Sequence, residues 1–146
     1  MELQDIMTTQ VAVVGPDNTV LDACKLMQIH NVGALPVCQH DGKVVGIVTD
    51  RDIVVRNIAN GGDPKTTPVR TVMTKDVICA NPSMEVEEAA ELMAQHKIRR
   101  LPVVQNDRLV GMVSIGDLAT RYRFVEEAGE ALSEISEPSR PVNIMQ

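Results

Sequence analysis

The residues best suited to chemistry are a hydroxyl and a carboxylate that occur together twice, three positions apart. Thr49 and Asp52 form one pair, and Ser114 and Asp117 form the other. Each pair stands where an apolar run of strand type gives way to a helix. The free N–H groups and the dipole of a helix N-terminus favour an anion. A hydroxyl can donate to phosphate or ribose oxygens, and a carboxylate accepts from vicinal hydroxyls.

The same pairs also have a purely structural interpretation. Ser/Thr-x-x-Asp is one way in which a helix caps its own first turn. For a single pair this interpretation is the better one. Two pairs at corresponding positions of a duplicated unit favour the binding role.

A second candidate is a cluster of positive charge in an acidic chain. Lys97, Arg99 and Arg100 place three cations within four residues, although the net charge of the protein is −6. Such a cluster suits phosphate. The structural alternative is a solvated helix end, where cations interact favourably with the helix dipole.

The remaining nucleophilic and metal-binding residue types form no recognisable constellation. The histidines have no metal-ligand spacing, and they combine with no serine or cysteine into a catalytic motif. The odd number of cysteines and the absence of C-x-x-C indicate small buried side chains in a reducing compartment. These residues are His30, His40, His96, Cys24, Cys38 and Cys79. We expect a cytoplasmic protein that is not an enzyme and holds no metal or cofactor.

The elements that must position these residues come from an internal repeat. Residues 7–37 align with residues 73–103 at an offset of 66, with twelve of the 31 positions identical. The offset then falls to 65, so that the two hydroxyl–carboxylate pairs coincide. The missing residue falls in a turn between two strands, where length changes cost least.

Each repeat begins with a predicted strand and helix. The β-rich runs 11–14 and 77–80 are each followed within two residues by a proline, which stops a strand. Asp17 and Ser83 are placed to cap the helices that follow. The helical segments that follow carry apolar residues on one face.

Each repeat ends with a predicted hairpin and a second helix. Strands at 35–38 and 44–48 are joined across Asp41-Gly42, a strong hairpin signal. The second helices are expected to begin at Asp52 and Asp117. A β-α-β-β-α unit of about 50 residues is too small to bury both faces of its sheet. We therefore expect an α+β fold related by a pseudo-twofold axis, with the sheets packed together and the helices outside.

Four segments follow from this organisation: repeat 1 at 1–59, a linker at 60–68, repeat 2 at 69–125, and an acidic C-terminal extension at 126–146. The linker is rich in turn formers and has no apolar period. The extension is expected to be helical to about Ser136 and then to end in a Pro-broken tail.

The repeat resembles the cystathionine-β-synthase (CBS) domain, and the tandem pair resembles a Bateman module, over roughly residues 1–124. The resemblance implies a module that binds AMP, ADP, ATP or an S-adenosyl compound such as S-adenosylmethionine, and that dimerises into a flat disc. It also implies that the hydroxyl and carboxylate contact phosphate or ribose, and no catalytic domain is left over. The stretch from Lys97 to Pro102 is similar to the phosphate-contacting stretch of the AMP-activated kinase γ subunit.

Carried over residue by residue, the resemblance implies two different sites. Site A combines Thr49, Arg51, Asp52, Val77, Ile78, Lys97, Arg99 and Arg100. Site B combines Ser114, Asp117, Val11, Ala12 and the segment 31–34, which includes Gly33. Asn31, Gly33 and Gly116 stand where site A has its cations. Site B therefore suits adenosine better than phosphate, and a vacant site B is an equal alternative.

Composition excludes several other classes of function. The negative net charge argues against nonspecific binding to nucleic acid or anionic membranes. Tyr122 and Phe124 are the only aromatic residues, too few for a base-stacking platform. The leading interpretation is a homodimeric nucleotide sensor. The alternative is a non-catalytic interaction protein with vestigial sites that regulates a partner enzyme.

Overall fold

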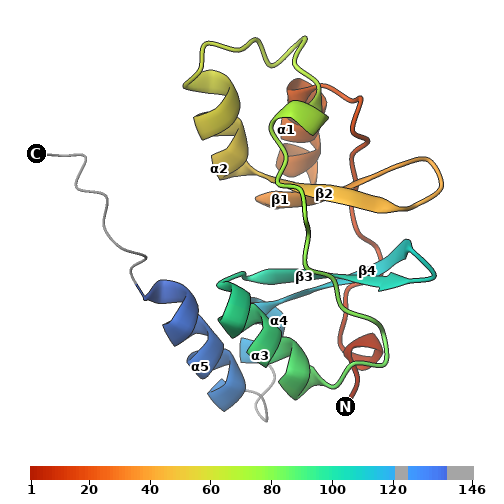
Figure 1. Ribbon diagram of the computed structural model, residues 1–146, viewed down its shortest axis with the longest axis vertical. Coiled ribbons are helices and arrows are strands. Elements are labelled where there is room, and N and C mark those ends of the chain that lie inside the picture. Colours follow the sequence, from red (N-terminus) through yellow and green to blue (C-terminus); the bar gives the residue numbers. More distant parts are fainter. Residues whose placement is uncertain (121–124, 138–146) are drawn as a thin grey trace, which may run out of the picture.

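The computed structural model describes residues 1–120 and 125–137. Its elements in chain order are η1 (Leu3–Asp5), α1 (Val20–His30), β1 (Ala34–Cys38), β2 (Val44–Thr49), α2 (Asp50–Asp52), η2 (Ile53–Ile58), η3 (Val69–Thr71), α3 (Val86–His96), β3 (Arg100–Gln105), β4 (Arg108–Ser114), α4 (Ile115–Ala119) and α5 (Val125–Ser136). We call α1, β1, β2, α2 and η2 lobe 1, and α3, β3, β4, α4 and α5 lobe 2. The two sheets face each other and the helices lie outside (Figure 1), which confirms the expected α+β fold.

Each sheet is a two-stranded antiparallel hairpin. β1 pairs with β2 from Ala34↔Thr49 onward, and β3 pairs with β4 from Arg100↔Ser114 onward. Gly42 turns the first hairpin with φ +87°. Asn106 and Asp107 turn the second with φ of 53° and 64°, as a two-residue hairpin turn of the I′ type requires.

The first strand expected in each repeat is reduced to a single bridge. Val14 pairs in parallel with Val37, and Ala80 pairs with Val103. A parallel ladder would continue through the N–H of the residue before each partner. That residue is Pro36 or Pro102, which has no N–H to donate. The prediction of strands at 11–14 and 77–80 was therefore wrong in extent.

The expected helix starts were also wrong. Thr19 caps α1, its Oγ1 accepting from the N–H of Asp22 at 3.1 Å, and Glu85 stands at the start of α3 without a side-chain cap. Asp17 instead pairs with the Arg70 guanidinium, and Ser83 donates to Asn81 Oδ1 at 2.8 Å. The second helices begin at Asp50 and Ile115, two residues before the predicted starts. Asp52 and Asp117 are thus third in their helices.

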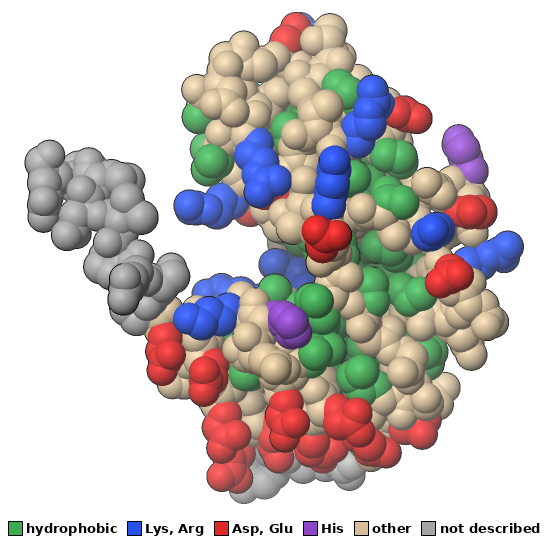
Figure 2. Space-filling view, viewed as in Figure 1, with side chains coloured by type: hydrophobic (Ala, Val, Ile, Leu, Met, Phe, Trp, Pro, Cys, Tyr) green, Lys and Arg blue, Asp and Glu red, His purple; other side chains and the backbone are tan. Residues whose placement is uncertain are grey.

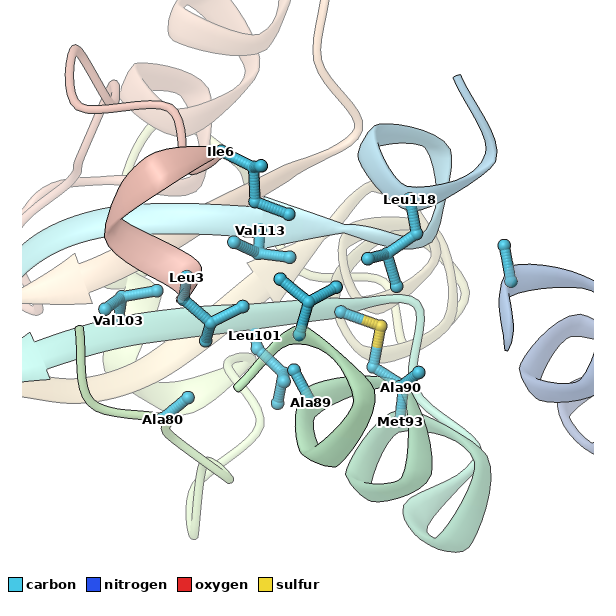
Figure 3. Packing of buried hydrophobic residues seen from close by; sticks show 12 residues of the cluster. Leu3, Ile6, Ala80, Ala89, Ala90, Met93, Leu101, Val103, Val113 and Leu118 are labelled. Carbon is cyan, nitrogen blue, oxygen red and sulfur yellow. The ribbon is translucent and has the colours of Figure 1, made fainter. Parts of the chain in front are cut away.

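Each lobe completes its core with a segment from the other repeat. Leu3 and Ile6 belong to the lobe 2 core (Figure 3). Val69, Val72 and Met73 belong to the lobe 1 core. The exchange is fastened by paired backbone hydrogen bonds, Thr8 with Met112 and Ile47 with Thr74. The units that repeat in sequence are therefore not the units that pack in space.

The C-terminal helix α5 lies on the outside of lobe 2. It packs against α3 and α4, and Ala128 and Ala131 are buried in this contact. None of the described helices is both long enough and apolar enough to cross a membrane. Residues 138–146, the predicted Pro-broken tail, lie outside the described residues, as do Tyr122 and Phe124.

Candidate functional site

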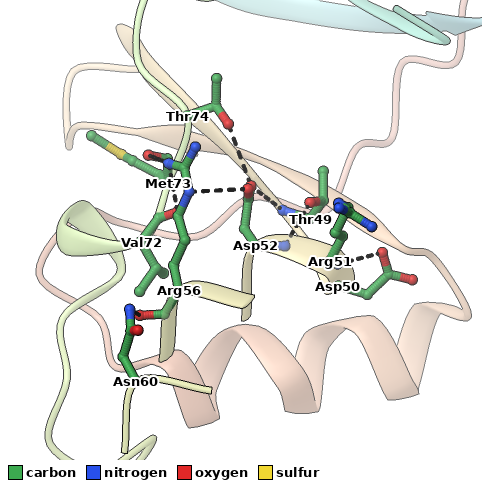
Figure 4. Close-up of polar contacts among 9 residues, drawn as sticks. All are labelled: Thr49, Asp50, Arg51, Asp52, Arg56, Asn60, Val72, Met73 and Thr74. Carbon is green, nitrogen blue, oxygen red and sulfur yellow. Dashed lines mark hydrogen bonds and ion pairs between the residues drawn. The ribbon is translucent and has the colours of Figure 1, made fainter. Parts of the chain in front are cut away.

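The strand–helix junction of lobe 1 is built as a capping box. Thr49 Oγ1 accepts from the N–H of Asp52 at 3.0 Å, and Asp52 Oδ2 accepts from the N–H of Thr49 at 3.0 Å (Figure 4). Both side chains therefore satisfy backbone groups at the start of α2. Thr49 and Asp52 thus cap the helix, as the structural interpretation predicted, and any binding role is additional to capping.

Asp52 also holds a network that sequence reasoning missed. Thr74 Oγ1 donates to Asp52 Oδ2 at 3.5 Å, and Arg56 Nε lies 3.8 Å from Asp52 Oδ1. Arg56 Nη1 donates to the carbonyl of Met73 at 3.1 Å. Asp52 is only 9% exposed. One sequence signal could have predicted the ion pair: Asp52 and Arg56 are four residues apart in a helical segment.

The junction of lobe 2 repeats the capping box. Asp117 Oδ2 accepts from the N–H of Ser114 at 2.8 Å, and Ser114 Oγ accepts from the N–H of Asp117 at 3.1 Å. Gly116 is exposed where lobe 1 carries Arg51, whose side chain is also exposed. The two junctions share a backbone design and differ in charge.

Residues that precede the first hairpin strand lie next to these junctions. The carbonyl of Gly33 accepts from the N–H of Asp50 at 2.9 Å, and the carbonyl of Arg99 accepts from the N–H of Ile115 at 2.8 Å. Asn31 and Lys97 end α1 and α3 in the left-handed conformation, with φ of 53° and 54°.

The three cations Lys97, Arg99 and Arg100 of the predicted site A lie between the end of α3 and the first residue of β3. Lys97 and Arg99 are exposed, and Arg100 is half-buried. Within residues 1–120 and 125–137, no hydrogen bond or ion pair joins them to the Thr49–Asp52 turn. Their grouping with that turn stays a prediction.

The apolar residues assigned to the sites are half-buried. Ile78 packs against the core of lobe 2, and Ala12 packs against the core of lobe 1. Val11 lines a groove of about 970 Å³ between residues 9–18, the first hairpin turn and β4. Sequence reasoning did not find this groove.

The two hairpins face each other with their turns at the same end of the sheet pair. Their turns meet, with Lys43 bridged to Arg108 and the N–H of Leu109 donating to the carbonyl of Gly42 at 3.0 Å. The opposite ends of the hairpins, where β2 ends and β3 begins, both lie on the other side of the sheet pair (Figure 1). Figure 2 shows an indentation between the lobes on that side, with Lys and Arg side chains on both of its edges.

The thiols are not activated. Only Cys38 is buried, whereas Cys24 is half-buried and Cys79 is exposed, so the expectation of three buried cysteines was wrong. Desolvation raises the pKa of the Cys38 thiol to about 11, and it also raises the pKa of Cys24 and of Cys79. All three thiols therefore stay protonated at neutral pH. Among the described residues, no three His, Cys, Asp or Glu side chains are grouped to hold a metal ion.

Comparison with known proteins gives a consistent result. A family model described as CBS domain matches residues 3–57 and 69–123. The CBS domain-containing protein YhcV of Bacillus subtilis (strain 168) is 50% identical over 134 residues, which cover 92% of this chain and 94% of the relative.

Two solved structures share the architecture. The hexameric CBS-CP12 protein from bloom-forming cyanobacteria matches with a TM-score of 0.74 and 41% identity, covering 86% of this chain and 74% of that one. The CBS domain pair of protein MJ0100, solved in complex with methylthioadenosine and S-adenosyl-L-methionine, matches with a TM-score of 0.75 and 27% identity. That match covers 84% of this chain and 96% of the other.

Proposed function

Because this chain belongs to the CBS domain family, we propose that it is a regulatory module that binds an adenosine nucleotide between its lobes. AMP, ADP and ATP are the preferred ligands, and an S-adenosyl compound such as the one bound by MJ0100 is the next candidate. The observation that carries the proposal is the gathering of cations around the indentation between the lobes (Figure 2), in a protein of net charge −6. An anionic ligand is what such a surface attracts.

Site A is where we place the phosphate and ribose. Thr49 and Asp52 stand at the start of α2. Arg100 begins β3 of the facing hairpin, and Lys97 and Arg99 lie between the end of α3 and that strand. Asp52 Oδ1 makes only the long 3.8 Å contact to Arg56 among the described residues. A carboxylate oxygen has lone pairs to spare for a ribose hydroxyl. Val77 and Ile78 would contact the base.

The backbone at Lys97 supports this assignment. Left-handed conformation at a non-glycine residue costs about 1–2 kcal/mol, and Asn tolerates it better than Lys. Repeat 1 has Asn31 at this position, whereas repeat 2 has a lysine with φ 54°. Lys97 therefore occupies a backbone position that costs free energy, and this supports a functional role for its charge.

Calorimetric titration of the purified protein tests the proposal. The panel is AMP, ADP, ATP, NAD and S-adenosylmethionine, with uncharged adenosine as the matched control for the phosphate. We expect the phosphorylated nucleotides to bind more tightly than adenosine, and their affinity to fall as salt is added. Equal affinity for adenosine and AMP would show that the site does not bind the phosphate group.

A second candidate function is favoured by the capping boxes. Thr49 and Asp52 already satisfy each other without a ligand, so their presence is also consistent with vestigial sites. The protein would then be a non-catalytic interaction module that regulates a partner enzyme. Absence of binding for every member of the calorimetric panel would decide in favour of this candidate.

We also propose that the module has no catalytic activity of its own, acts in the cytoplasm and forms a homodimer. The protonated thiols support the first point, since a nucleophilic cysteine needs a lowered pKa. Free cysteines are typical of a reducing compartment. The hexameric state of the CBS-CP12 protein supports self-association of CBS pairs.

A further inference from the structure

A second group of cations lies against lobe 1, apart from the three cations of the predicted site A. Arg56 on η2, Arg70 on η3 and Lys75 in the segment that follows line an open pocket of about 500 Å³, which we call the η3 pocket. Thr71 and Met73 complete its lining, and no carboxylate of the described residues belongs to it. The pocket therefore presents positive charge alone, in a protein of net charge −6.

The Arg56 guanidinium is fixed by contacts with its own lobe. Its Nη1 donates to the carbonyls of Met73 at 3.1 Å and Val72 at 3.4 Å, and its Nε lies 3.8 Å from Asp52 Oδ1 (Figure 4). Nη2 has no hydrogen-bond partner within residues 1–120 and 125–137. A guanidinium that is held in place and still has free N–H groups is well prepared to bind an oxyanion.

The charges of Arg70 and Lys75 are also available to a ligand. Arg70 Nη1 pairs with Asp17 Oδ1, but the two side chains are 53% and 86% exposed. An ion pair so exposed to water is weak. Lys75 is exposed, and its ammonium group takes part in no ion pair with the part of the chain that the structure describes.

The fold does not require these two cations. The structural alternative is that a cation at the end of a short helix interacts favourably with the helix dipole. However, η1 of repeat 1 corresponds to η3 and has matching backbone hydrogen bonds. The repeat offset of 66 places Gln4 and Thr9 where repeat 2 has Arg70 and Lys75. The same backbone thus forms without the positive charge, so the charge of repeat 2 calls for another explanation.

We propose that the η3 pocket binds a free phosphate anion, at a site separate from site A. Arginine matches two phosphate oxygens with its planar fork of N–H groups, and lysine adds a point charge. The Thr71 hydroxyl already donates to the carbonyl of Pro68 at 2.8 Å, so binding depends on the three cations. Lobe 1 would then take part in two anion sites, of which only site A needs an adenosine.

Titration with inorganic phosphate tests the proposal without nucleotide, so the outcome is independent of the proposed function. The probe is sodium phosphate, and sodium chloride at equal ionic strength is the control for screening. In two-dimensional NMR spectra, the amide signals of residues 70–75 should shift in a saturable way with phosphate and stay in place with chloride. Shifts confined to residues 97–100 would place the anion in site A and overturn the proposal, as would the absence of saturable shifts.

The counterparts in repeat 1 supply the variant for this titration. Arg70→Gln/Lys75→Thr should lower the affinity for phosphate by about tenfold or more, because two charged partners are lost. Lys97→Asn/Arg99→Gly is the matched control, since it removes the same charge from site A and should leave the shifts at residues 70–75 unchanged. All four positions are exposed, so circular dichroism should show unchanged folds. Wild-type phosphate affinity in the first variant would contradict the proposal.

A variant with an effect of opposite sign separates binding from a structural role. Asp17→Asn removes the carboxylate that competes for the Arg70 guanidinium, so the affinity for phosphate should rise, by about fivefold at most. A purely structural ion pair would give a loss of stability and no gain in phosphate affinity. That result would show that Arg70 does not contact the anion.

ATP distinguishes a free anion from the distal phosphates of a nucleotide that is bound in site A. We expect inorganic phosphate to shift the amide signals of residues 70–75 by itself. If ATP shifts them and inorganic phosphate does not, the η3 pocket is an extension of site A and the proposal is wrong.

Discussion

The two strand–helix junctions have nearly the same backbone and different side chains. In both, a hydroxyl and a carboxylate cap the helix with hydrogen bonds of 2.8–3.1 Å. In both, the preceding helix ends in a left-handed residue. On this shared frame, repeat 2 carries Lys97 and Arg99 where repeat 1 carries Asn31 and Gly33.

The comparison separates what builds the fold from what selects a ligand. Capping groups and turn conformations occur in both lobes and are explained by backbone needs alone. The cations occur in one lobe and are explained by no backbone need: Asn is better suited than Lys to the left-handed position at 31 and 97, and the backbone at Gly33 and Arg99 has no positive φ. Binding specificity should therefore change when these side chains are exchanged, while the fold remains.

The largest effect is expected when the cations of repeat 2 are replaced by their counterparts in repeat 1. Lys97→Asn/Arg99→Gly removes two charged partners of phosphate, each worth about 1.5–3 kcal/mol. Affinity for AMP should fall by about 100-fold or more, and affinity for adenosine should change little. Calorimetry at low and physiological salt measures both.

The matched control for this exchange is Lys43→Asn/Arg108→Gly, which removes the same charge from the hairpin turns at the opposite end of the sheets. It should leave AMP binding unchanged. Equal losses for adenosine and AMP in the double variant at 97 and 99 would instead indicate a disturbed base pocket.

A smaller effect on binding is expected at the capping carboxylates. Asp52→Asn keeps an oxygen for the N–H of Thr49 but loses the charge that would bind ribose hydroxyls. Nucleotide affinity should fall by about 10- to 100-fold, the equivalent of about 1.5–3 kcal/mol. Asp117→Asn should have less effect on nucleotide affinity, because only site A combines a carboxylate with cations. Wild-type calorimetric affinity in both variants would show that the ribose assignment is wrong.

The reciprocal exchange of segments predicts matched losses of stability in the two lobes. A Cβ on Gly46 would lie 2.5 Å from Met73 Sδ, and one on Gly111 would lie 2.5 Å from Met7 Sδ. Gly46→Ala and Gly111→Ala should each lower the free energy of unfolding by about 1–3 kcal/mol in urea titrations. Gly116→Ala is the control, since its nearest neighbour would be 3.5 Å away. A loss in only one of the two variants would mean that the exchange supports the lobes unequally.

The smallest effect is a gain of stability. Lys97→Gly relieves the left-handed strain and should raise the free energy of unfolding by about 1 kcal/mol, while it weakens AMP binding. Asn31→Lys should lower the free energy of unfolding by a similar amount. Thermal unfolding and calorimetry of the same samples would show whether stability and binding move in opposite directions. If the Lys97→Gly variant binds AMP with wild-type affinity, Lys97 does not contact the phosphate.

The hairpins, the paired capping boxes and the order of elements could be predicted from the sequence, because their signals lie within a few residues of each other. Asp41-Gly42 and Asn106-Asp107 sit in the observed turns. Thr49 with Asp52 and Ser114 with Asp117 sit at the observed helix starts. The two incorrect strand predictions had a local cause as well: Pro36 and Pro102 lie in the partner strand and withhold the needed N–H.

Only the tertiary structure decided which distant segments meet. The repeat offset gives no indication that Leu3 packs with Leu101 or that Thr74 donates to Asp52. It equally leaves open that α5 covers one lobe and leaves the other exposed. Local hydrogen bonds and turn conformations depend on neighbouring residue types. The exchange of segments depends on how two incomplete cores best bury their apolar surface together, and nothing in a single repeat encodes that.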